Sequence, residues 1–321
     1  MTVSNEPASG ISGQPAMPCV AVLIPCHNEA LAVATVIQDF RAALPNAAIY
    51  VYDNNSTDHT TTVAADAGAI VRREPQQGKG SVVRRMFADV DADVFVLVDG
   101  DATYHAASAP TMIDLLRADR LDMVTGRRED IAQAAYRPGH RFGNRLLTGL
   151  VTTVFGCRTG DMLSGYRVMS RRFVKSFPAL STGFEIETEL TVHALALGLP
   201  MADVRTPYAE RPEGSASKLR TLRDGWRILR TIITLVQHER PLPLFSAIAG
   251  LLFVAAAGLA TPLWITWIET GLVPRLPTAV LCASMMVAAM LALVCGLVLD
   301  SVKQARREAK RLAYLSVSNK M

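Results

Sequence analysis

The sequence has little of several features that define other classes of protein. Only five of its 321 residues are cysteines, none of them in a CxxC pair, and aromatic residues make up 6% of the chain. This odd, scattered set of cysteines argues against a disulfide framework or a zinc site and fits a reducing compartment. Charged residues are sparse at 19%, and a net charge of +4 is too small to indicate nucleic-acid binding. The first 17 residues lack the basic and apolar segments of a signal peptide, and their Ser, Gly and Pro content predicts a disordered tail.

Apolar residues, in contrast, make up half of the chain, which excludes a disordered or fibrous protein. Two runs carry no charge at all, 28 residues over 241–268 and 24 residues over 276–299. A helix needs about 20 apolar residues to cross a bilayer. Two buried core helices are the alternative, but both runs are too long and too uninterrupted for a soluble core. Basic residues flank the pair on both outer sides, so we expect two transmembrane helices within 241–299 of the inner (plasma) membrane, with both ends cytoplasmic and 300–321 as a basic tail.

Residues 218–240, directly before the first run, carry apolar side chains at spacings of three or four, with arginines between them. This pattern predicts a basic amphipathic helix that lies on an anionic membrane surface. A solvated helix packed on the globular domain is the alternative, and the position beside a membrane span favours the interfacial helix.

Residues 18–217 alternate between strand-like and helix-like runs. Strands are expected at 20–24, 48–52, 69–72, 94–98 and 122–125, and helices at 30–43, 58–67 and 79–89. The alternation predicts an α/β domain with a Rossmann-like, mainly parallel sheet covered on both faces. Because ligands bind such sheets beyond the carboxyl ends of the strands, the side chains that follow each strand form the candidate site.

The most informative strand end is Asp99-Gly100-Asp101, which follows a buried apolar run. Two carboxylates one residue apart form a hard-oxygen site that suits Mg²⁺ or Mn²⁺ bound together with substrate phosphates. A solvated turn is the alternative for any single DxD. Two further polar strand ends, 25–29 and 53–58, are expected beside it, although the second is also a good turn and helix cap by itself.

The segments IPCHNEA, YDNNSTD, GKG and VDGDATY, in this order and spacing, resemble family 2 glycosyltransferases with the GT-A fold. The later segments GDMLSGYRVMSRR, GFEIETEL and YAERPEGSASKLRT, followed by a basic helix and membrane spans, resemble the polyprenyl-phosphate glycosyltransferases, the dolichyl-phosphate mannose synthase-like group. The resemblance covers about residues 18–240. It implies a membrane-anchored, inverting, metal-dependent enzyme that transfers a sugar from a nucleotide-sugar donor to a polyprenyl phosphate for cell-envelope glycans or lipid glycosylation.

The same resemblance implies roles for individual residues. The nucleotide-sugar pocket would include Pro25, His27, Glu29, Asp53, Asn55, Lys79, Asp99 and Gly100, with Arg211 and Lys218 reaching the phosphates from a mobile loop. Asp99 and Asp101 would hold the metal, and Asp101 and Asp161 would be catalytic. Two residues depart from the pattern: His27 stands where the mannose synthases usually have Tyr, and Thr103 where that group often has Gln as a metal ligand.

Four arginines suit the acceptor phosphate because a guanidinium offers planar donors, namely Arg127, Arg141, Arg145 and Arg167. The family match favours Arg141 and Arg145 near the acceptor, and a structural ion pair with Asp161 is the alternative for Arg167. Glu185 and Glu187 are candidate contacts for sugar hydroxyls, or ordinary acids at a helix N-terminus.

Two other functions stay open at this point. A processive polysaccharide synthase would usually carry a QxxRW motif, which this sequence lacks. A membrane scaffold that binds nucleotide without turnover would be favoured by loss of the DxD, but Asp99 and Asp101 are both present. The expected partners are the donor, the lipid acceptor and the bilayer, with no nucleic acid; a homo-oligomer is possible.

Overall fold

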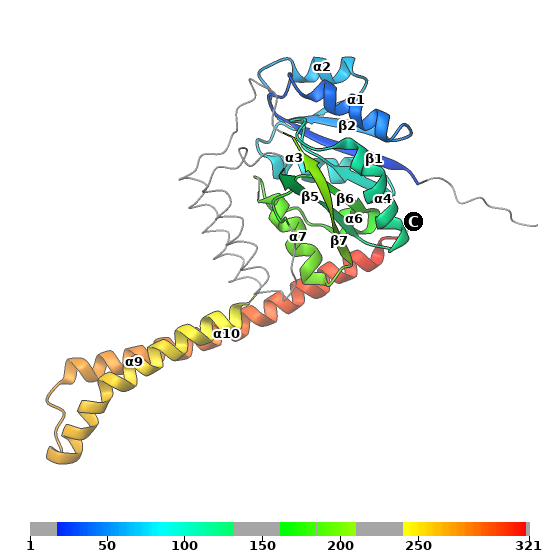
Figure 1. Ribbon diagram of the computed structural model, residues 1–321. Helices are drawn as coiled ribbons and strands as arrows, with labels where there is room; N and C mark the ends of the chain where they lie inside the picture. Colours follow the sequence, from blue (N-terminus) through cyan, green and yellow to red (C-terminus); the bar gives the residue numbers. More distant parts are fainter. Residues whose placement is uncertain (1–17, 131–160, 184, 210–239, 319–321) are drawn as a thin grey trace, which may run out of the picture.

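The computed structural model describes residues 18–130, 161–183, 185–209 and 240–318 (Figure 1). Within these ranges the chain forms a sheet domain and, at the carboxyl-terminal side, a long pair of antiparallel helices that projects from it. The predicted order of strands and helices in the first half of the chain is therefore present. Two of the expected regions, 1–17 and most of 218–240, lie outside the described residues.

The described strands form a single seven-stranded sheet in the order β3-β2-β1-β4-β6-β5-β7. Their bounds are β1 Val20–Cys26, β2 Ala48–Asp53, β3 Ile70–Arg73, β4 Val94–Leu97, β5 Met123–Asp130, β6 Arg167–Ser170 and β7 Met201–Tyr208. Six of them run parallel, and β6 runs antiparallel between β4 and β5. The carboxyl ends of the six parallel strands therefore share one edge, here called the site edge, and their amino ends share the opposite rear edge.

Helices cover both faces of the sheet. Their bounds are α1 Val33–Ala43, α2 Thr60–Asp66, α3 Lys79–Asp89, η1 Ala106–Ser108, α4 Ala109–Ala118, α6 Arg171–Ser176 and α7 Ile186–Leu197. Successive residues of β1 point to opposite faces, so Val22 packs in the cluster under α1 and α4, and Leu23 in the cluster under α3, α6 and α7. Both faces are buried, which explains why β1 and β4 are continuously apolar rather than alternating.

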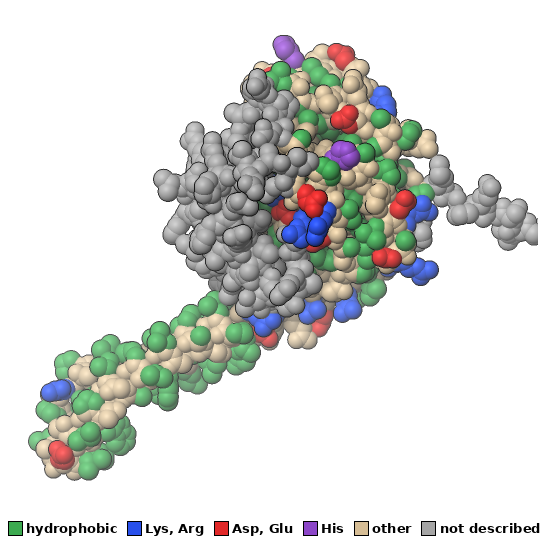
Figure 2. All heavy atoms as spheres, in the orientation of Figure 1, with side chains coloured by type: hydrophobic (Ala, Val, Ile, Leu, Met, Phe, Trp, Pro, Cys, Tyr) green, Lys and Arg blue, Asp and Glu red, His purple; other side chains and the backbone are tan. Residues whose placement is uncertain are grey.

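The two uncharged runs form α9 Pro241–Thr270 and α10 Leu276–Ser316, both long and apolar enough to cross a membrane. Small residues line their contact at intervals of seven, with Ala249 and Ala256 on α9 and Cys282, Ala289 and Gly296 on α10. A Cβ on Gly296 would lie 2.9 Å from the Cβ of Phe245, so the helices approach closely there. Most other side chains of the hairpin are exposed and apolar (Figure 2).

The sequence did not indicate where the hairpin would meet the domain. The segment predicted as a basic tail, 300–321, continues α10 as far as Ser316, and its last turns contact α6 and α7. The Tyr314 hydroxyl donates a hydrogen bond to Asp122 Oδ2 at 2.9 Å, at the rear edge. Arg172 lies 5.0 Å over the Tyr314 ring and donates through Nε to the carbonyl of Val317 at 3.1 Å.

Candidate active site

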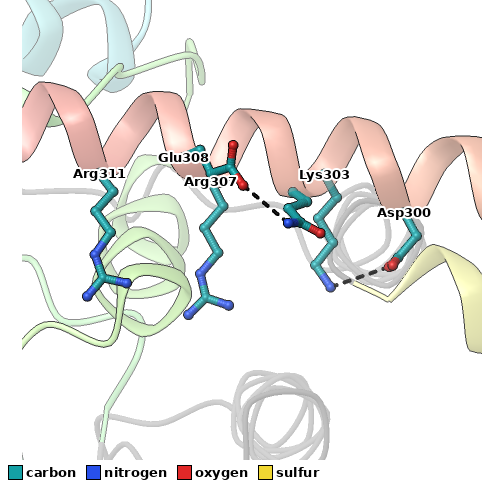
Figure 3. A pocket seen from close by; sticks show the side chains of 6 residues that line it. Asp300, Lys303, Arg307, Glu308 and Arg311 are labelled. Carbon is teal, nitrogen blue, oxygen red and sulfur yellow. Dashed lines mark hydrogen bonds and ion pairs between the residues drawn. The ribbon is translucent and has the colours of Figure 1, made fainter.

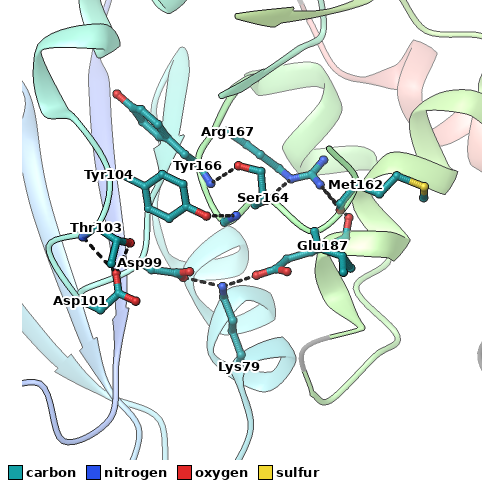
Figure 4. Close-up of polar contacts among 12 residues, drawn as sticks. Lys79, Asp99, Asp101, Thr103, Tyr104, Met162, Ser164, Tyr166, Arg167 and Glu187 are labelled. Atoms are coloured by element: carbon teal, nitrogen blue, oxygen red, sulfur yellow. Dashed lines mark hydrogen bonds and ion pairs between the residues drawn. The ribbon is translucent and has the colours of Figure 1, made fainter. Parts of the chain in front are cut away.

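The acidic loop Asp99-Gly100-Asp101 lies at the site edge directly after β4, as predicted (Figure 4). A Cβ on Gly100 would lie 2.7 Å from Cys26 Sγ, so only glycine allows this loop to sit against the end of β1. Asp101 is 4% exposed, and its Oδ1 accepts a hydrogen bond of 2.6 Å from the Thr103 hydroxyl. Thr103, where a third metal ligand was considered, therefore orients the Asp101 carboxylate.

Lys79 joins the acidic loop to α7. Its ammonium lies 2.5 Å from Asp99 Oδ1 and 2.5 Å from Glu187 Oε1, and its side chain is 8% exposed (Figure 4). Lys79 begins α3, and Glu187 lies in the first turn of α7, so the cluster ties together two helices that are distant in sequence. The pairing of Lys79 with these two carboxylates was not predicted, although each residue was a candidate by itself.

Burial and charge act in opposite directions on this cluster. Burial would lower the pKa of Lys79, but the carboxylates of Asp99 and Glu187 outweigh it and raise the pKa well above its usual value. Burial raises the pKa of Glu187, with Asp99 adding to the effect and Lys79 opposing it. Lys79 is therefore a permanent cation that holds the Asp99 carboxylate in place at the site edge.

A loop before β6 supports Asp99 from behind. A Cβ on Gly165 would lie 2.3 Å from Asp99 Oδ2, so the bare backbone of Gly165 packs directly against the carboxylate. The Gly165 amide donates to the Tyr104 hydroxyl at 2.8 Å, and the Tyr104 ring packs against Tyr166 and Tyr208 at centroid distances of 5.6 and 5.3 Å. Burial raises the pKa of Tyr104 well above its usual value, which keeps the phenol neutral. Gly165 and Tyr104 stand inside the segments that carried the family resemblance, but the sequence did not single them out.

The ends of β1 and β2 are tied to one another by polar contacts. His27 Nδ1 lies 2.9 Å from the carbonyl oxygen of Asn54. The Asp53 carboxylate is 3% exposed and accepts the backbone N–H of Ser56 at 3.2 Å. Pro25 pairs with Tyr52 in the parallel register of the two strands. The candidates at the ends of β1 and β2 are thus brought together, and several of them also hold the loops in place.

Asn54, which the sequence did not select, is the central residue of this region. Its amide nitrogen donates to the carbonyls of Glu74 and Gln76, both at 2.9 Å, and its Oδ1 accepts from Gly78 N at 2.7 Å. The neighbouring candidate Asn55 has a left-handed φ of 59° and donates to the Pro75 carbonyl at 2.7 Å. These contacts fix the loop that leads into α3 and Lys79.

Glu29 lies at the start of the helical region after β1. Its backbone N–H donates to the Thr60 hydroxyl at 2.9 Å, which joins this loop to the start of α2. Glu29 and His27 are both partly exposed, so their side chains border the site edge rather than its interior.

The predicted catalytic acid Asp161 forms a two-point ion pair with Arg128, whose Nε and Nη2 lie 2.7 and 2.9 Å from the carboxylate oxygens. Burial would raise the pKa of Asp161, but the hydrogen bonds and charge of Arg128 lower it below its usual value. The Arg128 guanidinium also lies 5.5 Å from the centre of the Tyr208 ring. Asp161 is thus a fixed anion. Arg128, next to the exposed candidate Arg127, was missed because its partner Asp161 lies 33 positions away and leaves no local signal in the sequence.

The structure corrects the expectation for Arg167. This side chain is 0% exposed, so an acceptor phosphate arriving from outside does not reach it. Its guanidinium donates to the carbonyls of Ser164, Met162 and Glu187 and to the Thr191 hydroxyl. Burial lowers the pKa of Arg167. Arg167 therefore holds the loop before β6 against α7, and the ion pair considered as its alternative is made by Arg128 instead.

Four further candidates lie outside the described residues, namely Arg141, Arg145, Arg211 and Lys218. Their roles stay predictions. Within the described ranges, no group of three or more His, Cys, Asp or Glu side chains is placed to hold a metal. Two carboxylates on one loop, Asp99 and Asp101, are nevertheless a donor set that fits a divalent cation shared with substrate phosphates, because Mg²⁺ is usually bound through one or two carboxylates plus phosphate oxygens.

Comparison with known proteins identifies the family. A sequence profile described as Glycosyl transferase family 2 matches residues 21–177. The glycosyltransferase AglJ of Haloferax volcanii is 32% identical over 303 residues, which cover 94% of this chain and 99% of that protein. The dolichyl-phosphate hexose transferase of the same organism is 28% identical over 222 residues, covering 69% of this chain and 95% of that protein. This chain therefore belongs to glycosyltransferase family 2, as its motifs predicted.

Solved structures support the fold. Glucosyl-3-phosphoglycerate synthase from Mycobacterium tuberculosis, in complex with Mn²⁺, uridine-diphosphate-glucose and phosphoglyceric acid, superposes with a TM-score of 0.56 at 23% sequence identity. The match covers 73% of this chain and 84% of that one. The sheet domain has the GT-A-like fold that was expected, and the hairpin formed by α9 and α10 follows it.

Proposed function

We propose that the protein is a membrane-anchored, inverting glycosyltransferase that transfers a sugar from a nucleotide-sugar donor to a polyprenyl phosphate. The observation that carries the proposal is the direct attachment of a family 2 site to a pair of long apolar helices, since a lipid acceptor has to be met at a membrane. The name of the Haloferax dolichyl-phosphate hexose transferase supports this acceptor class. The basic residues on both sides of the hairpin support a cytoplasmic catalytic domain.

On the donor side, Asp99 and Asp101 would hold Mg²⁺ or Mn²⁺ together with the diphosphate. The cation would neutralise charge that develops on the leaving diphosphate. Lys79 places a fixed positive charge 2.5 Å from Asp99 at the same edge, where it also stabilises that charge. Thr103 and Gly165 hold the two carboxylates in position, so little reorganisation is needed during the reaction.

On the acceptor side, a phosphate oxygen of the lipid would attack the anomeric carbon from the face opposite the leaving group. The new carbon–oxygen bond forms as the bond to the nucleotide diphosphate breaks, which inverts the configuration. A phosphate monoester has a second pKa near 6 and is largely dianionic at neutral pH. The lipid phosphate therefore needs no strong general base to attack. The harder task for the enzyme is to hold two anions, the lipid phosphate and the donor diphosphate, close together. Arg127 is exposed, and its guanidinium would donate hydrogen bonds to the phosphate of the lipid acceptor. Arg141 and Arg145, which lie outside the described residues, would do the same.

The test is product analysis with the full chain in lipid nanodiscs. Radiolabelled UDP- and GDP-sugars would be supplied one at a time with Mn²⁺, with and without undecaprenyl or dolichyl phosphate. We expect label to enter the organic phase as a mild-acid-labile glycolipid only when both the matching donor and the lipid phosphate are present. Label in a water-soluble polymer would instead favour a polysaccharide synthase. Donor binding without turnover on any acceptor would favour a scaffold.

A second experiment addresses orientation. Reporter fusions in the 271–275 loop and after Met321 should give opposite topology signals, the second one cytoplasmic. Equal signals at the two positions would contradict the hairpin topology.

A further inference from the structure

The helix α10 extends well past its apolar part. The uncharged run ends at Leu299, and the helix continues to Ser316. At a rise of 1.5 Å per residue, the fifteen steps from Leu299 to Tyr314 span about 22 Å. This length is more than an anchor requires, since anchoring needs only the apolar segment.

The far end of α10 is attached to the rear edge of the sheet by a buried carboxylate. Asp122, which is 4% exposed and precedes β5, accepts the Tyr314 hydroxyl at Oδ2 and the Ser170 hydroxyl at Oδ1, at 2.9 and 2.7 Å. Ser170 in turn caps α6 by accepting the backbone N–H of Phe173 at 3.0 Å. One carboxylate thus links α10, β5 and α6. Hydrogen bonds to buried charged groups are among the stronger ones in proteins.

The direction of α10 relative to the sheet gives this attachment a geometric consequence. α10 runs beneath the domain toward its far side, whereas the parallel strands start at the rear edge and run obliquely back toward the side from which the hairpin leaves (Figure 1). The attachment at Tyr314 therefore holds the rear edge about 22 Å beyond the apolar run, and the site edge lies at the other end of the strands, on the side nearer the hairpin.

We propose that the contact between Tyr314 and Asp122 is a positioning contact that fixes the height of the site edge above the bilayer. Tyr314 and Asp122 touch no substrate; they set the distance at which the site meets an acceptor in the bilayer. This inference rests on the proposed function, in that the acceptor is a membrane lipid.

The middle of α10 supports this placement. Lys303, Arg307 and Arg311 recur every four residues, and all three line the same hollow, with Arg307 and Arg311 projecting to the same side (Figure 3). They follow the apolar run directly, where cationic side chains meet anionic headgroups. The headgroup layer therefore coincides with the segment between the apolar run and the attachment at Tyr314.

The test compares Tyr314→Phe, Asp122→Asn and a chain that ends at Leu312 with a control, Leu315→Ala. Tyr314→Phe keeps the ring beneath Arg172 and removes only the hydroxyl, and Leu315 is 63% exposed in the same turn. Transfer is measured on a long-chain polyprenyl phosphate in nanodiscs and on a short-chain, water-soluble polyprenyl phosphate. We expect Tyr314→Phe to raise the KM for the bilayer acceptor about tenfold, and the truncation to raise it further. The KM and kcat for the soluble acceptor should change less than twofold, and Leu315→Ala should match the unaltered chain.

A second measurement needs no turnover. A dye on Ala107→Cys, in a chain whose Cys19, Cys157 and Cys295 are serine, reports the height of the domain by energy transfer to acceptor dyes in the lipid headgroups. We expect a narrow distance distribution that broadens in Tyr314→Phe and in the truncated chain. The positioning role is overturned if the distance distribution is unchanged in these variants. It is also overturned if they lose transfer activity equally on the bilayer and the water-soluble polyprenyl phosphate. If the unaltered chain glycosylates neither acceptor, the proposed function fails, while the height measurement still decides whether α10 holds the domain.

Discussion

The two halves of the site edge are held in different ways. Around β1 and β2, polar side chains bind nearby backbone groups, as Asn54 does with the loop that leads into α3. Around β5, β6 and α7, charged side chains bind one another or distant carbonyls, as in the pair of Arg128 with Asp161 and the buried Arg167. The half at β1 and β2, which we propose binds the donor, is thus shaped by loop geometry. The half at β5, β6 and α7, which we propose faces the acceptor, is shaped by charges whose loss of a partner costs much stability.

The largest effect is expected where the reacting charge develops. Asp101→Asn removes a carboxylate charge from the acidic loop while keeping the shape that accepts the Thr103 hydroxyl. We expect turnover to fall by about 10³-fold or more, because fixed electrostatic groups at such sites contribute factors of this size. The melting temperature should stay nearly unchanged.

The matched control is Asp114→Asn, an exposed carboxylate on α4. It should retain full activity when both variants are assayed with labelled donor over a range of Mn²⁺ concentrations. Full metal-dependent activity in Asp101→Asn would contradict the role given to this carboxylate.

Gly165→Ala should disturb the junction between the two halves. The added methyl would lie 2.3 Å from Asp99 Oδ2, so either the loop before β6 or the carboxylate has to move. A displacement of about 1 Å at a reacting centre can cost roughly 10²-fold in rate. We expect a loss of about that size in kcat, measured on protein that still folds. Gly258→Ala, where no atom lies within 4 Å of the added methyl, is the control, and equal rates in the two variants would refute the packing argument.

The half of the site edge at β5, β6 and α7 is sensitive to the loss of a single charged partner. Arg128→Gln leaves the Asp161 carboxylate buried without its cation, which we expect to cost about 3 kcal/mol of stability. Arg127→Gln next to it removes an exposed side chain and should change stability by no more than about 0.5 kcal/mol. Melting curves of the detergent-solubilised chain provide the measurement. If the pair is the cause, Arg128→Gln combined with Asp161→Asn regains part of the loss.

The same contrast explains what could be predicted from the sequence. The alternation of apolar and polar runs indicated the sheet and the helices that cover it, and the site loops were found because Asp99-Gly100-Asp101 and its companions are short and contiguous. Partners far apart in sequence left no local signal. Lys79 meets Glu187 across 108 positions, and Arg128 meets Asp161 across 33, so neither pairing could be inferred from spacing.

The hairpin shows the same limit. Its apolar runs were plain in the composition, and their contact follows small residues at intervals of seven. The basic residues after Leu299 looked like a solvated tail because nothing local reveals that Tyr314 reaches Asp122, 192 positions earlier in the chain. A cluster of basic residues predicts an exposed segment, but it does not predict whether that segment faces the solvent, the membrane or another part of the protein.

The smallest expected effect lies between α7 and α10, at a buried histidine. His193 is 1% exposed, packs edge-on against Phe173 and Phe177, and neither ring nitrogen has a hydrogen-bond partner among the described residues. Burial, with Lys310 of α10 adding to it, lowers the pKa of His193 from 6.5 to about 3. The unfolded chain therefore binds a proton that the folded chain does not, and stability falls as the pH drops from about 6.5 toward 3, by about 1.4 kcal/mol per pH unit.

His193→Leu removes this proton uptake and the two unsatisfied nitrogens, at the loss of two ring contacts. We expect a melting temperature at pH 7.5 that is equal or slightly higher, and a clearly smaller drop between pH 7.5 and pH 5.5 than in the unaltered chain. The exposed His59→Leu should keep the original pH dependence. A drop of the same size in His193→Leu would show that other groups set the acid sensitivity, and that the contact between α7 and α10 is not its source.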